Sequence, residues 1–366
     1  MKMGKSIYIG VMTGTSCDAI DVSFITVNQK VNLEFFHSIK IPKKNQTEIK
    51  NLIESSEISL SSLGKINKEI GEMYSRAIEK SILLSGVQKK DIKSIALSGQ
   101  TVWHEINRGK GFSMQLGDPN IVAADLNIPV IDNLRGMHIA IGGQGAPLVP
   151  EFHHNIFYKK NKKSLVVNIG GISNFTYIKN KNDFFGSDIG PGNALMDAYC
   201  QKNLDRPFDK NGSVAAKGIV LQKELKRLMS LKFFDEPFPK STGKELFNYE
   251  LIGKTLLSES PKDILATLTE FTATSILAAV QKNNISPHDV VICGGGVKNK
   301  FLVERISELL NISVTTSEDE GFNSQAIESM AFAWFGFRRL NNIQSIVQIS
   351  NKISKKALLG TLTSSK

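Results

Sequence analysis

Residues 7–27, IYIGVMTGTSCDAIDVSFITV, constrain the fold more than any other stretch of the chain. An apolar run from Ile7 to Met12 leads into small hydroxylated and glycine residues, and two carboxylates precede a second apolar run, Val22 to Val27. This pattern predicts two strands joined by a tight polar turn. Such a turn can bind an anion through its N–H groups, with carboxylates near enough to hold a cation, although an ordinary hairpin has the same composition.

The same order of features returns in the second half of the chain. Residues 164–178, SLVVNIGGISNFTYI, read as an apolar strand, a Gly/Ser/Asn turn and another apolar strand. Between the two hairpins, helical periodicity over 65–86 alternates with buried-strand patterns at 94–99 and 128–133, and beyond the second hairpin a helical pattern covers 214–231. We therefore predict an α/β protein in which one supersecondary unit is used twice, with both copies facing a common cleft.

Length and composition limit the alternatives. A chain of 366 residues with 41% apolar residues predicts two globular domains. We expect a division into 1–135 and 136–340, with the segment from about 340 to 366 packing back on the first domain. No apolar run approaches the roughly 20 residues of a membrane span. Because the N-terminus also lacks a signal peptide's apolar core, we expect a cytoplasmic protein with no membrane partner.

Charge and cysteine usage exclude other classes. The net charge of +10 favours anionic small molecules, but no basic run is interleaved with aromatic residues, so we expect no nucleic-acid partner. The three cysteines are widely spaced and the six histidines form no metal-binding spacing.

Two further segments could carry chemistry. VVICGGG, residues 290–296, reads as a buried strand whose three glycines leave the backbone bare for a ligand, or simply form a packing turn. In SDIGPGN, residues 187–193, Asp188 precedes a glycine–proline turn that leads into a helix. A carboxylate fixed near a phosphate site can accept a proton from an attacking oxygen, whereas the plainer interpretation is a helix cap. We expect Asp197, further into that helix, to be structural or solvent-facing.

One segment only looks like a phosphate-binding loop. PKSTGK, residues 239–244, ends in Gly-Lys, but Phe238 stands where a P-loop needs glycine, and Glu245 replaces the magnesium-binding Ser or Thr. We therefore exclude a Walker A motif here.

Taken together, the motifs of this chain resemble those of the anhydro-N-acetylmuramic acid kinase family, in the actin/sugar-kinase/Hsp70 fold group. The resemblance covers nearly the whole chain and rests on these ordered segments: MTGTSCDAID, SGQTVWHE (98–105), QLGDPNIVA (115–123), GGQGAPLVPEFH (142–153), NIGGISNFTYI, DIGPGNALMD, FPKSTGKELFN (238–248), DILATLTEFTA (263–273), CGGG and ESMAFAWF (328–335). It implies an actin-like (ribonuclease H-like) duplicated α/β fold, with two domains around a central nucleotide and sugar cleft.

The resemblance also implies a reaction. Such an enzyme transfers a phosphoryl group from ATP, with Mg²⁺, to O6 of 1,6-anhydro-N-acetylmuramic acid while water opens the anhydro bridge, giving N-acetylmuramic acid 6-phosphate for cell-wall recycling. Asp188 matches the catalytic aspartate that activates the water attacking C1. A homodimer is implied as well.

The remaining site residues follow from the same resemblance. The ATP-binding positions would be Gly14, Thr15, Ser16, Cys17, Asp18, Asp21, Gly170, Gly171, Ser173, Asn174, Gly294, Gly295 and Gly296. Asp18 would also hold the metal, through water. The sugar-binding positions would be Gln100, Thr101, His104, Gln115, Arg135 and Glu328, with Arg135 as a bidentate partner of the lactyl carboxylate.

The chain departs from the family pattern at several positions. Ala19 and Ile189 stand where glycine and threonine are usual, Gly136-Met137-His138 replaces an Arg/Asp-rich stretch, and Val297-Lys298-Asn299 replaces Ala-His-Asn. None of these changes removes the aspartate or the phosphate turns. The alternatives are a non-catalytic sugar or nucleotide sensor and a related sugar kinase on the same fold.

Overall fold

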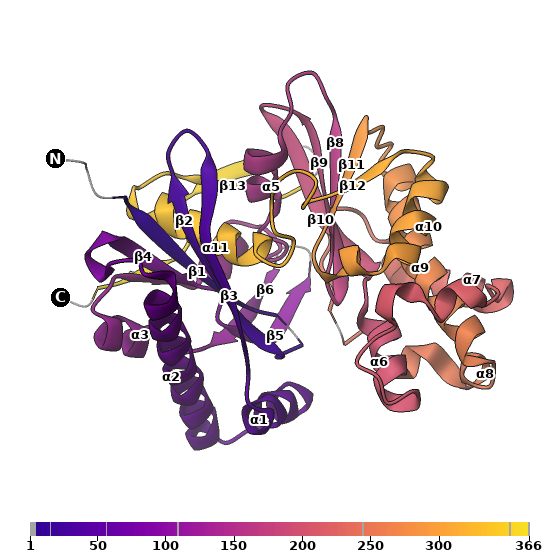
Figure 1. The fold of residues 1–366 in the computed structure, drawn as a ribbon, viewed down its shortest axis with the longest axis horizontal. Helices are drawn as coiled ribbons and strands as arrows, with labels where there is room; N and C mark the ends of the chain where they lie inside the picture. The colour runs from indigo at the N-terminus through magenta and orange to yellow at the C-terminus, as the bar shows by residue number, and fades with distance from the viewer. Residues whose placement is uncertain are drawn as a thin grey trace. The chain divides into compact units, whose positions relative to one another are not determined.

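The computed structural model describes residues 5–14, 16–55, 57–107, 110–243, 245–350 and 353–364. The chain divides into two compact units, drawn in Figure 1. Unit 1 comprises Met1–Phe152 and Ala326–Lys366, and unit 2 comprises His153–Gln325. The division at residues 135 and 340 stays a sequence-based prediction.

Unit 1 is built on a six-stranded sheet with the order β15-β7-β4-β1-β2-β3. The first three strands are antiparallel neighbours, β4 and β7 run parallel to β1, and β15 pairs antiparallel with β7. Their bounds are β1 Ile7–Thr13, β2 Ala19–Val27, β3 Val31–Lys40, β4 Ile92–Leu97, β7 Val130–Asp132 and β15 Thr361–Thr363.

Strand β1 is buried on both faces, and its alternating side chains meet different helices. Ile9 and Val11 lie in the core cluster that includes residues of α2 (Leu60–Ser85) and α3 (Pro119–Leu126). On the other face, Tyr8 packs edge-on against Phe337 of α11 (Ile327–Leu340), with ring centroids 5.0 Å apart. Gly10 is required there, because a Cβ atom would lie 1.9 Å from the Ser329 carbonyl oxygen.

Smaller elements complete unit 1. The hairpin of β5 and β6 forms a separate two-stranded sheet, and so do β13 and β14 near the end of the chain. The bounds are α1 Lys43–Glu54, η1 Lys89–Asp91, β5 Gln100–Asn107, β6 Lys110–Leu116, α4 Leu134–Ala140, α5 Pro150–Phe157, β13 Ser345–Gln348 and β14 Ser354–Ala357; α5 continues into unit 2.

Unit 2 repeats the strand order of unit 1. Its five-stranded sheet runs β10-β9-β8-β11-β12, with the first three strands antiparallel and the last two parallel to β8. The bounds are β8 Ser164–Ile169, β9 Ile172–Asn180, β10 Asp183–Pro191, β11 Asp289–Cys293 and β12 Val314–Thr316. This order matches β3-β2-β1-β4-β7, so the predicted duplicated, actin-like α/β fold is confirmed.

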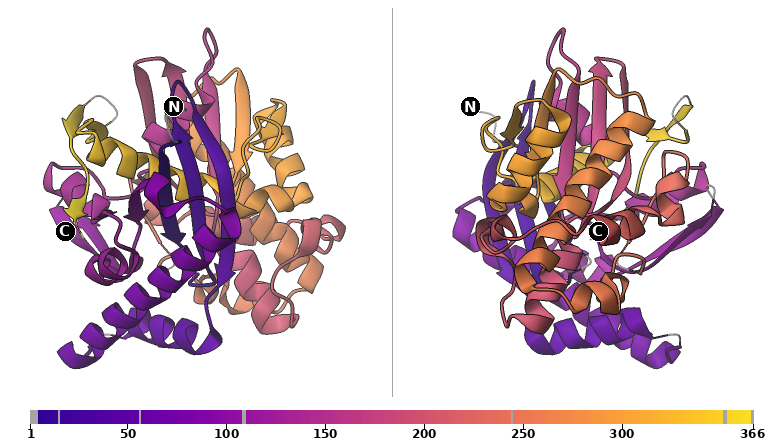
Figure 2. Two further views of the ribbon diagram at one scale, coloured as in Figure 1. Left: turned by 60° about the vertical axis from the view of Figure 1, so that its left-hand side comes forward. Right: turned by 90° about the vertical axis from the view of Figure 1, so that its right-hand side faces the viewer.

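Helices α9 and α10 cover one face of the second sheet, as the right-hand view of Figure 2 shows. By length and composition α9 could cross a membrane, but 72% of its most apolar window is buried inside the fold, as in the core helix of a globular domain. The bounds in unit 2 are α6 Ala194–Asn203, η2 Lys210–Gly212, η3 Ala215–Lys217, α7 Gln222–Met229, η4 Lys232–Asp235, η5 Tyr249–Ile252, α8 Gly253–Leu257, α9 Pro261–Lys282, η6 Gly295–Lys298 and α10 Lys300–Leu310.

One helix expected from periodicity is broken. Residues 214–231 form a short 3-10 turn, then an extended link, then α7. The break falls at Gly218, where the backbone passes so close to α9 that a Cβ atom would lie 2.1 Å from the Lys262 carbonyl oxygen. Close packing of two backbones therefore overrides the local helical pattern.

Candidate active site

Asp188 lies near the end of β10 and is only 5% exposed. The backbone N–H of Thr242 donates to its Oδ2 across 3.0 Å, and the hydroxyl of Ser241 donates to the same oxygen across 3.3 Å. The pairing of β10 with β9 shifts register between Asp188 and Gly190, so Ile189 is a bulge residue. A bulge redirects neighbouring side chains, and it sets Asp188 opposite Asn174 of the second predicted phosphate turn.

Ser241 and Thr242 were not predicted as site residues. They belong to the PKSTGK segment that only resembles a phosphate loop, and the structure gives this segment another role as the partner of β10. The Asp188 N–H donates to the Lys240 carbonyl across 3.1 Å, and the Lys240 N–H donates to the Ser187 hydroxyl across 2.8 Å. No periodicity or spacing in the sequence signals this pairing.

The first polar turn follows β1. The Cys17 N–H donates to the Gly14 carbonyl across 3.1 Å, and Cys17 adopts a left-handed conformation with φ 57°. The Cys17 side chain is buried in the core of unit 1, whereas Asp18 is exposed and Asp21 is half-buried in β2. Ser16 is half-buried in the turn, and Thr15 lies outside the described residues.

The second polar turn joins β8 to β9 and is tied to the start of α6. The Gly171 carbonyl accepts from the N–H of Gly192 across 2.9 Å, and the Gly170 carbonyl accepts from Asn193 N–H across 2.8 Å. The buried Ser173 hydroxyl donates to the Pro191 carbonyl across 3.1 Å. Within the described structure the buried Oδ1 of Asn174 accepts no hydrogen bond. A buried acceptor of this kind can take a hydrogen bond from water or from a bound ligand.

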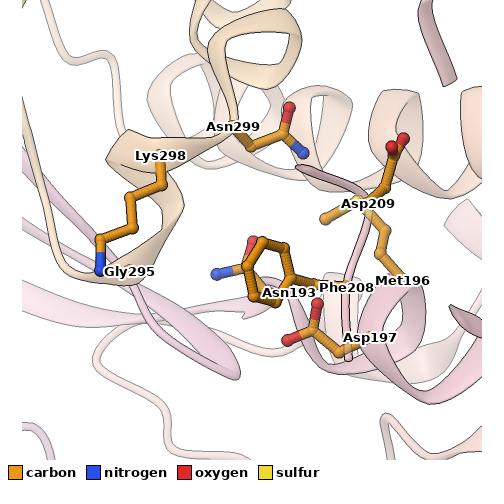
Figure 3. A pocket seen from close by; sticks show the side chains of 8 residues that line it. All are labelled: Asn193, Met196, Asp197, Phe208, Asp209, Gly295, Lys298 and Asn299. Carbon is orange, nitrogen blue, oxygen red and sulfur yellow. The ribbon is translucent and has the colours of Figure 1, made fainter. Parts of the chain in front are cut away.

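The third glycine segment follows β11 and borders a pocket. Gly294 has φ 79°, and η6 begins at Gly295. The pocket is lined by Asn193, Met196, Asp197, Phe208, Asp209, Gly295, Lys298 and Asn299. Figure 3 shows side chains from α6 and from the loop after it grouped together, with Asn299 at the start of α10 above them and Lys298 of η6 to one side. Of these residues only Gly295 was predicted as a ligand contact. Asp197, expected to be structural or solvent-facing, is half-buried and lines the pocket.

Two pocket residues are also structural anchors. The Asp209 carboxylate accepts from the backbone N–H groups of Val214 and Ala215, each across 3.0 Å. Asn299 caps α10 by accepting from the Leu302 N–H across 3.1 Å. These contacts fix the rim of the pocket. Phe208 is 47% exposed, so its ring stays available to a ligand.

In unit 1, the hairpin of β5 and β6 brings several predicted sugar-binding residues together. Thr101 pairs with Gln115 and His104 with Ser113. The Gln115 amide donates to the Thr101 hydroxyl across 3.3 Å, and the His104 Nδ1 lies 2.9 Å from the Ser113 hydroxyl. Burial and the nearby Arg135 guanidinium lower the pKa of His104 to about 4, so its imidazole is neutral at pH 7. The structure thus groups Thr101, His104 and Gln115 with Arg135.

Arg135 and His138, both on α4, hold the backbone of one residue, Gly145, from its two sides. The Arg135 Nη1 donates to the Gly145 carbonyl across 2.8 Å, and the His138 Nδ1 accepts from the Gly145 N–H across 3.0 Å. His138 belongs to Gly136-Met137-His138, the stretch that departs from the family pattern. Because it binds the same residue as Arg135, the departure still leaves the partner of Arg135 fixed in place.

Gln100 and Glu328 occupy other elements of unit 1. Gln100 is buried at the start of β5, its amide donates to the Thr101 carbonyl across 3.1 Å, and its Oε1 has no hydrogen-bond donor in the described part of the chain. Glu328 lies in the first turn of α11. Its assignment to the sugar side stays a prediction.

The fold and these turns define a class of protein. Two sheets of the same order, each with a glycine-rich polar turn after its first strand, form the duplicated α/β scaffold of actin-like nucleotide-dependent phosphotransferases. A model of the family "Anhydro-N-acetylmuramic acid kinase" matches residues 6–365. This chain belongs to the anhydro-N-acetylmuramic acid kinase family.

Curated relatives agree over the full length. The chain is 54% identical to an anhydro-N-acetylmuramic acid kinase of Gamma-proteobacterium EBAC31A08, covering 100% of both chains. It is 36% identical to that of Vibrio cholerae serotype O1, covering 98% of both. Among solved structures, the activator of the 2-hydroxyisocaproyl-CoA dehydratase from Clostridium difficile with bound ADPNP aligns over 92% of this chain and 96% of its own, at 13% identity and a TM-score of 0.49.

Proposed function

We propose that this protein is an ATP-dependent kinase that converts 1,6-anhydro-N-acetylmuramic acid and water to N-acetylmuramic acid 6-phosphate, a step in the recycling of cell-wall peptidoglycan. Membership of the family supports the reaction. The single observation that carries it is the buried Asp188 carboxylate, held by two donors at one oxygen. A sensor that only binds these ligands has no need of a carboxylate fixed in this way, and the non-catalytic alternative is not favoured.

Asp188 acts as the general base. It takes a proton from water as the water oxygen bonds to C1 of the sugar, and the C1–O6 bond breaks with its electron pair moving to O6. O6 then takes the γ-phosphoryl group of ATP, and the bond from that phosphorus to the bridging oxygen breaks to leave ADP. Ser241 and Thr242 both donate to Oδ2, which fixes the plane of the carboxylate toward the water.

The glycine turns and the pocket of unit 2 bind ATP. Bare backbone at 170–171 and at 294–296 lets phosphates and ribose approach closely. The exposed ring of Phe208 stacks on the base, while Asn193 and Asp197 offer polar partners at its edge. In unit 1, the turn from Gly14 to Asp21 binds phosphate oxygens.

Magnesium fits the exposed carboxylate of Asp18 through water. Among the described residues no group of three His, Cys, Asp or Glu side chains could enclose a metal ion, and a single exposed carboxylate is the donor that a largely hydrated Mg²⁺ accepts. When bound, the ion neutralises charge on the phosphates of ATP.

The polar groups of unit 1 bind the sugar. Arg135, whose Nη1 is oriented by Gly145, pairs with the lactyl carboxylate. The neutral His104 imidazole and the Thr101–Gln115 pair bind hydroxyl and amide groups without adding charge. We expect a cytoplasmic protein that forms a homodimer, and sedimentation of the purified protein tests the dimer.

Turnover tests the function directly. The protein is incubated with ATP, magnesium and anhydro-N-acetylmuramic acid in ¹⁸O water, and ADP and labelled sugar phosphate are measured. We expect ¹⁸O at C1 and none in the phosphate. Asp188→Asn should lower kcat by about 10²–10⁴-fold with little change in sugar KM. The control is Asp183→Asn, because Asp183 is on the same strand but paired at the surface with Lys179.

Other outcomes identify the alternatives. Binding of both ligands without ADP release would indicate a sensor. ADP release only with a different sugar would indicate a related sugar kinase.

A further inference from the structure

Lys240 is the most enclosed lysine near the proposed base. It is 4% exposed, and its ammonium lies 3.9 Å from the ring centroid of Phe233, 4.7 Å from that of Phe238 and 5.7 Å from that of Phe234. The ammonium also donates to the Phe233 carbonyl. Three aromatic faces and one carbonyl thus replace the water around this cation.

The backbone of Lys240 is tied to β10 from both sides. Its N–H donates to the Ser187 hydroxyl across 2.8 Å, and its carbonyl accepts from that hydroxyl across 3.0 Å and from the Asp188 N–H across 3.1 Å. The next two residues, Ser241 and Thr242, donate to the Asp188 carboxylate. Three consecutive residues therefore connect the caged ammonium to the proposed base.

Packing alone does not account for a charge at this position. Lysine is almost never fully buried, because its ammonium loses hydration, and an apolar side chain of similar length would fill the aromatic cage at lower cost. A cation does have one property that an apolar chain lacks. Its contacts with a carbonyl and with ring faces fix the position of the ammonium. The backbone of Lys240 therefore keeps one position relative to β10.

We propose that Lys240 is a positioning residue for the proposed reaction, which fixes Ser241 and Thr242 so that they orient the carboxylate of Asp188. This inference rests on the proposed function. The Lys240 ammonium is enclosed by the phenylalanine rings and the Phe233 carbonyl. It acts through the two donors, so its loss should affect the chemical step and leave binding of ATP and sugar nearly unchanged.

Electrostatics adds a pH signature. Burial, with a smaller contribution from the Lys282 ammonium, lowers the pKa of Lys240 to about 8, while Glu236, Asp235 and Asp188 oppose the decrease. As pH rises through this value the ammonium loses its proton and its attraction to the rings. The kcat of the wild-type enzyme should therefore fall above pH 8.

The experiment compares Lys240→Met and Lys240→Arg with Lys202→Met. Lys202 is a matched control because its ammonium lies 4.0 Å from the Tyr249 ring centroid but contacts neither β10 nor Asp188 in the described structure. We expect Lys240→Met to lower kcat about tenfold or more, with both KM values within about twofold of wild type. Lys240→Arg should recover part of kcat and move the alkaline fall beyond pH 10, because arginine keeps its charge.

Two results would overturn the inference: a kcat of Lys240→Met within about twofold of wild type per folded molecule, or an alkaline fall that is unchanged in Lys240→Arg. If Lys240→Met does not fold, the pH profile of Lys240→Arg decides alone. Failure of the proposed function looks different, because wild type would then not release ADP with the anhydro sugar, or Asp188→Asn would stay active.

Discussion

The backbone N–H of Thr242 donates a hydrogen bond to the carboxylate of Asp188 across 3.0 Å, although the two residues lie 54 positions apart in the sequence. The bond joins a buried strand end to an irregular loop. A main-chain donor cannot be lost by ordinary side-chain replacement, so the orientation of the carboxylate depends on the path of the loop rather than on the side chain of residue 242.

This relationship gives the first prediction. Thr242→Pro removes the N–H and should lower kcat by about 10–100-fold, because a hydrogen bond to a charged group contributes about 1.5–3 kcal/mol. Thr242→Ala keeps the N–H and should retain kcat within about twofold. Ser241→Ala removes the longer, weaker bond of 3.3 Å and should fall between them. Steady-state kinetics on the three variants decides, and equal losses in Thr242→Ala and Thr242→Pro would contradict the main-chain role.

Replacement by alanine should have different effects at two adjacent glycines, Gly294 and Gly295. At Gly294, with φ 79°, a Cβ atom would lie 2.4 Å from the Asn168 Oδ1, so Gly294→Ala should destabilise unit 2 by about 2–4 kcal/mol. At Gly295 the nearest atom would be the Asn193 Nδ2 at 3.8 Å, so Gly295→Ala should fold normally. Because Gly295 lines the pocket, its methyl group should raise the KM for ATP. Urea unfolding and ATP titration separate the two effects, and a normal ATP KM in Gly295→Ala would count against base or ribose binding there.

Phe208 should contribute to nucleotide affinity. Stacking of a base on an aromatic ring is worth about 1–3 kcal/mol, so Phe208→Ala should raise the KM for ATP about 5- to 100-fold with kcat nearly unchanged. The control is Ile219→Ala, since Ile219 is an exposed apolar residue of the same unit that does not line the pocket. Equal KM values in the two variants would exclude the stacking role.

Glu151 should make the stability of unit 1 depend on pH. Burial raises the pKa of its carboxyl from 4.5 to about 7, although the Arg338 guanidinium, 3.2 Å away, lowers it in part. Between these values the folded protein binds a proton that the unfolded chain does not. Unfolding free energy should therefore increase as pH falls from 7 toward 4.5, by up to about 3 kcal/mol. Urea unfolding at several pH values checks this, with Glu151→Gln as the control because glutamine has no carboxyl group to bind a proton. A wild-type-minus-variant difference that is constant with pH would refute it.

Local sequence patterns were sufficient to predict the two hairpins and the duplicated scaffold. Alternation and apolar runs predicted both hairpins, because a strand buried on one or both faces must repeat its pattern in the chain itself. The matching sheet orders of units 1 and 2 confirm the duplication inferred from those hairpins. The expected helix over 214–231 was wrong in its middle, because Gly218 packs against α9 and no neighbour in the sequence reveals that contact.

The site was predictable only in part. Gly295 was expected near the nucleotide and borders the pocket, but Phe208 and Asp197 were not expected there. A phenylalanine in a loop and an aspartate inside a helix have ordinary structural explanations, and only their convergence on one cavity distinguishes them.

The sequence by itself determined the duplicated fold and the family, because these depend on periodicity and on ordered motifs along the chain, and it predicted Asp188 as the catalytic aspartate. The tertiary structure alone decided how that aspartate is held. Its hydrogen-bond donors are Ser241 and Thr242, in a segment whose sequence resembles a phosphate-binding loop. The ammonium of Lys240, enclosed by three phenylalanine rings, anchors this segment. Contacts between an irregular loop and a distant strand depend on chain packing in three dimensions and leave no periodic trace in the sequence.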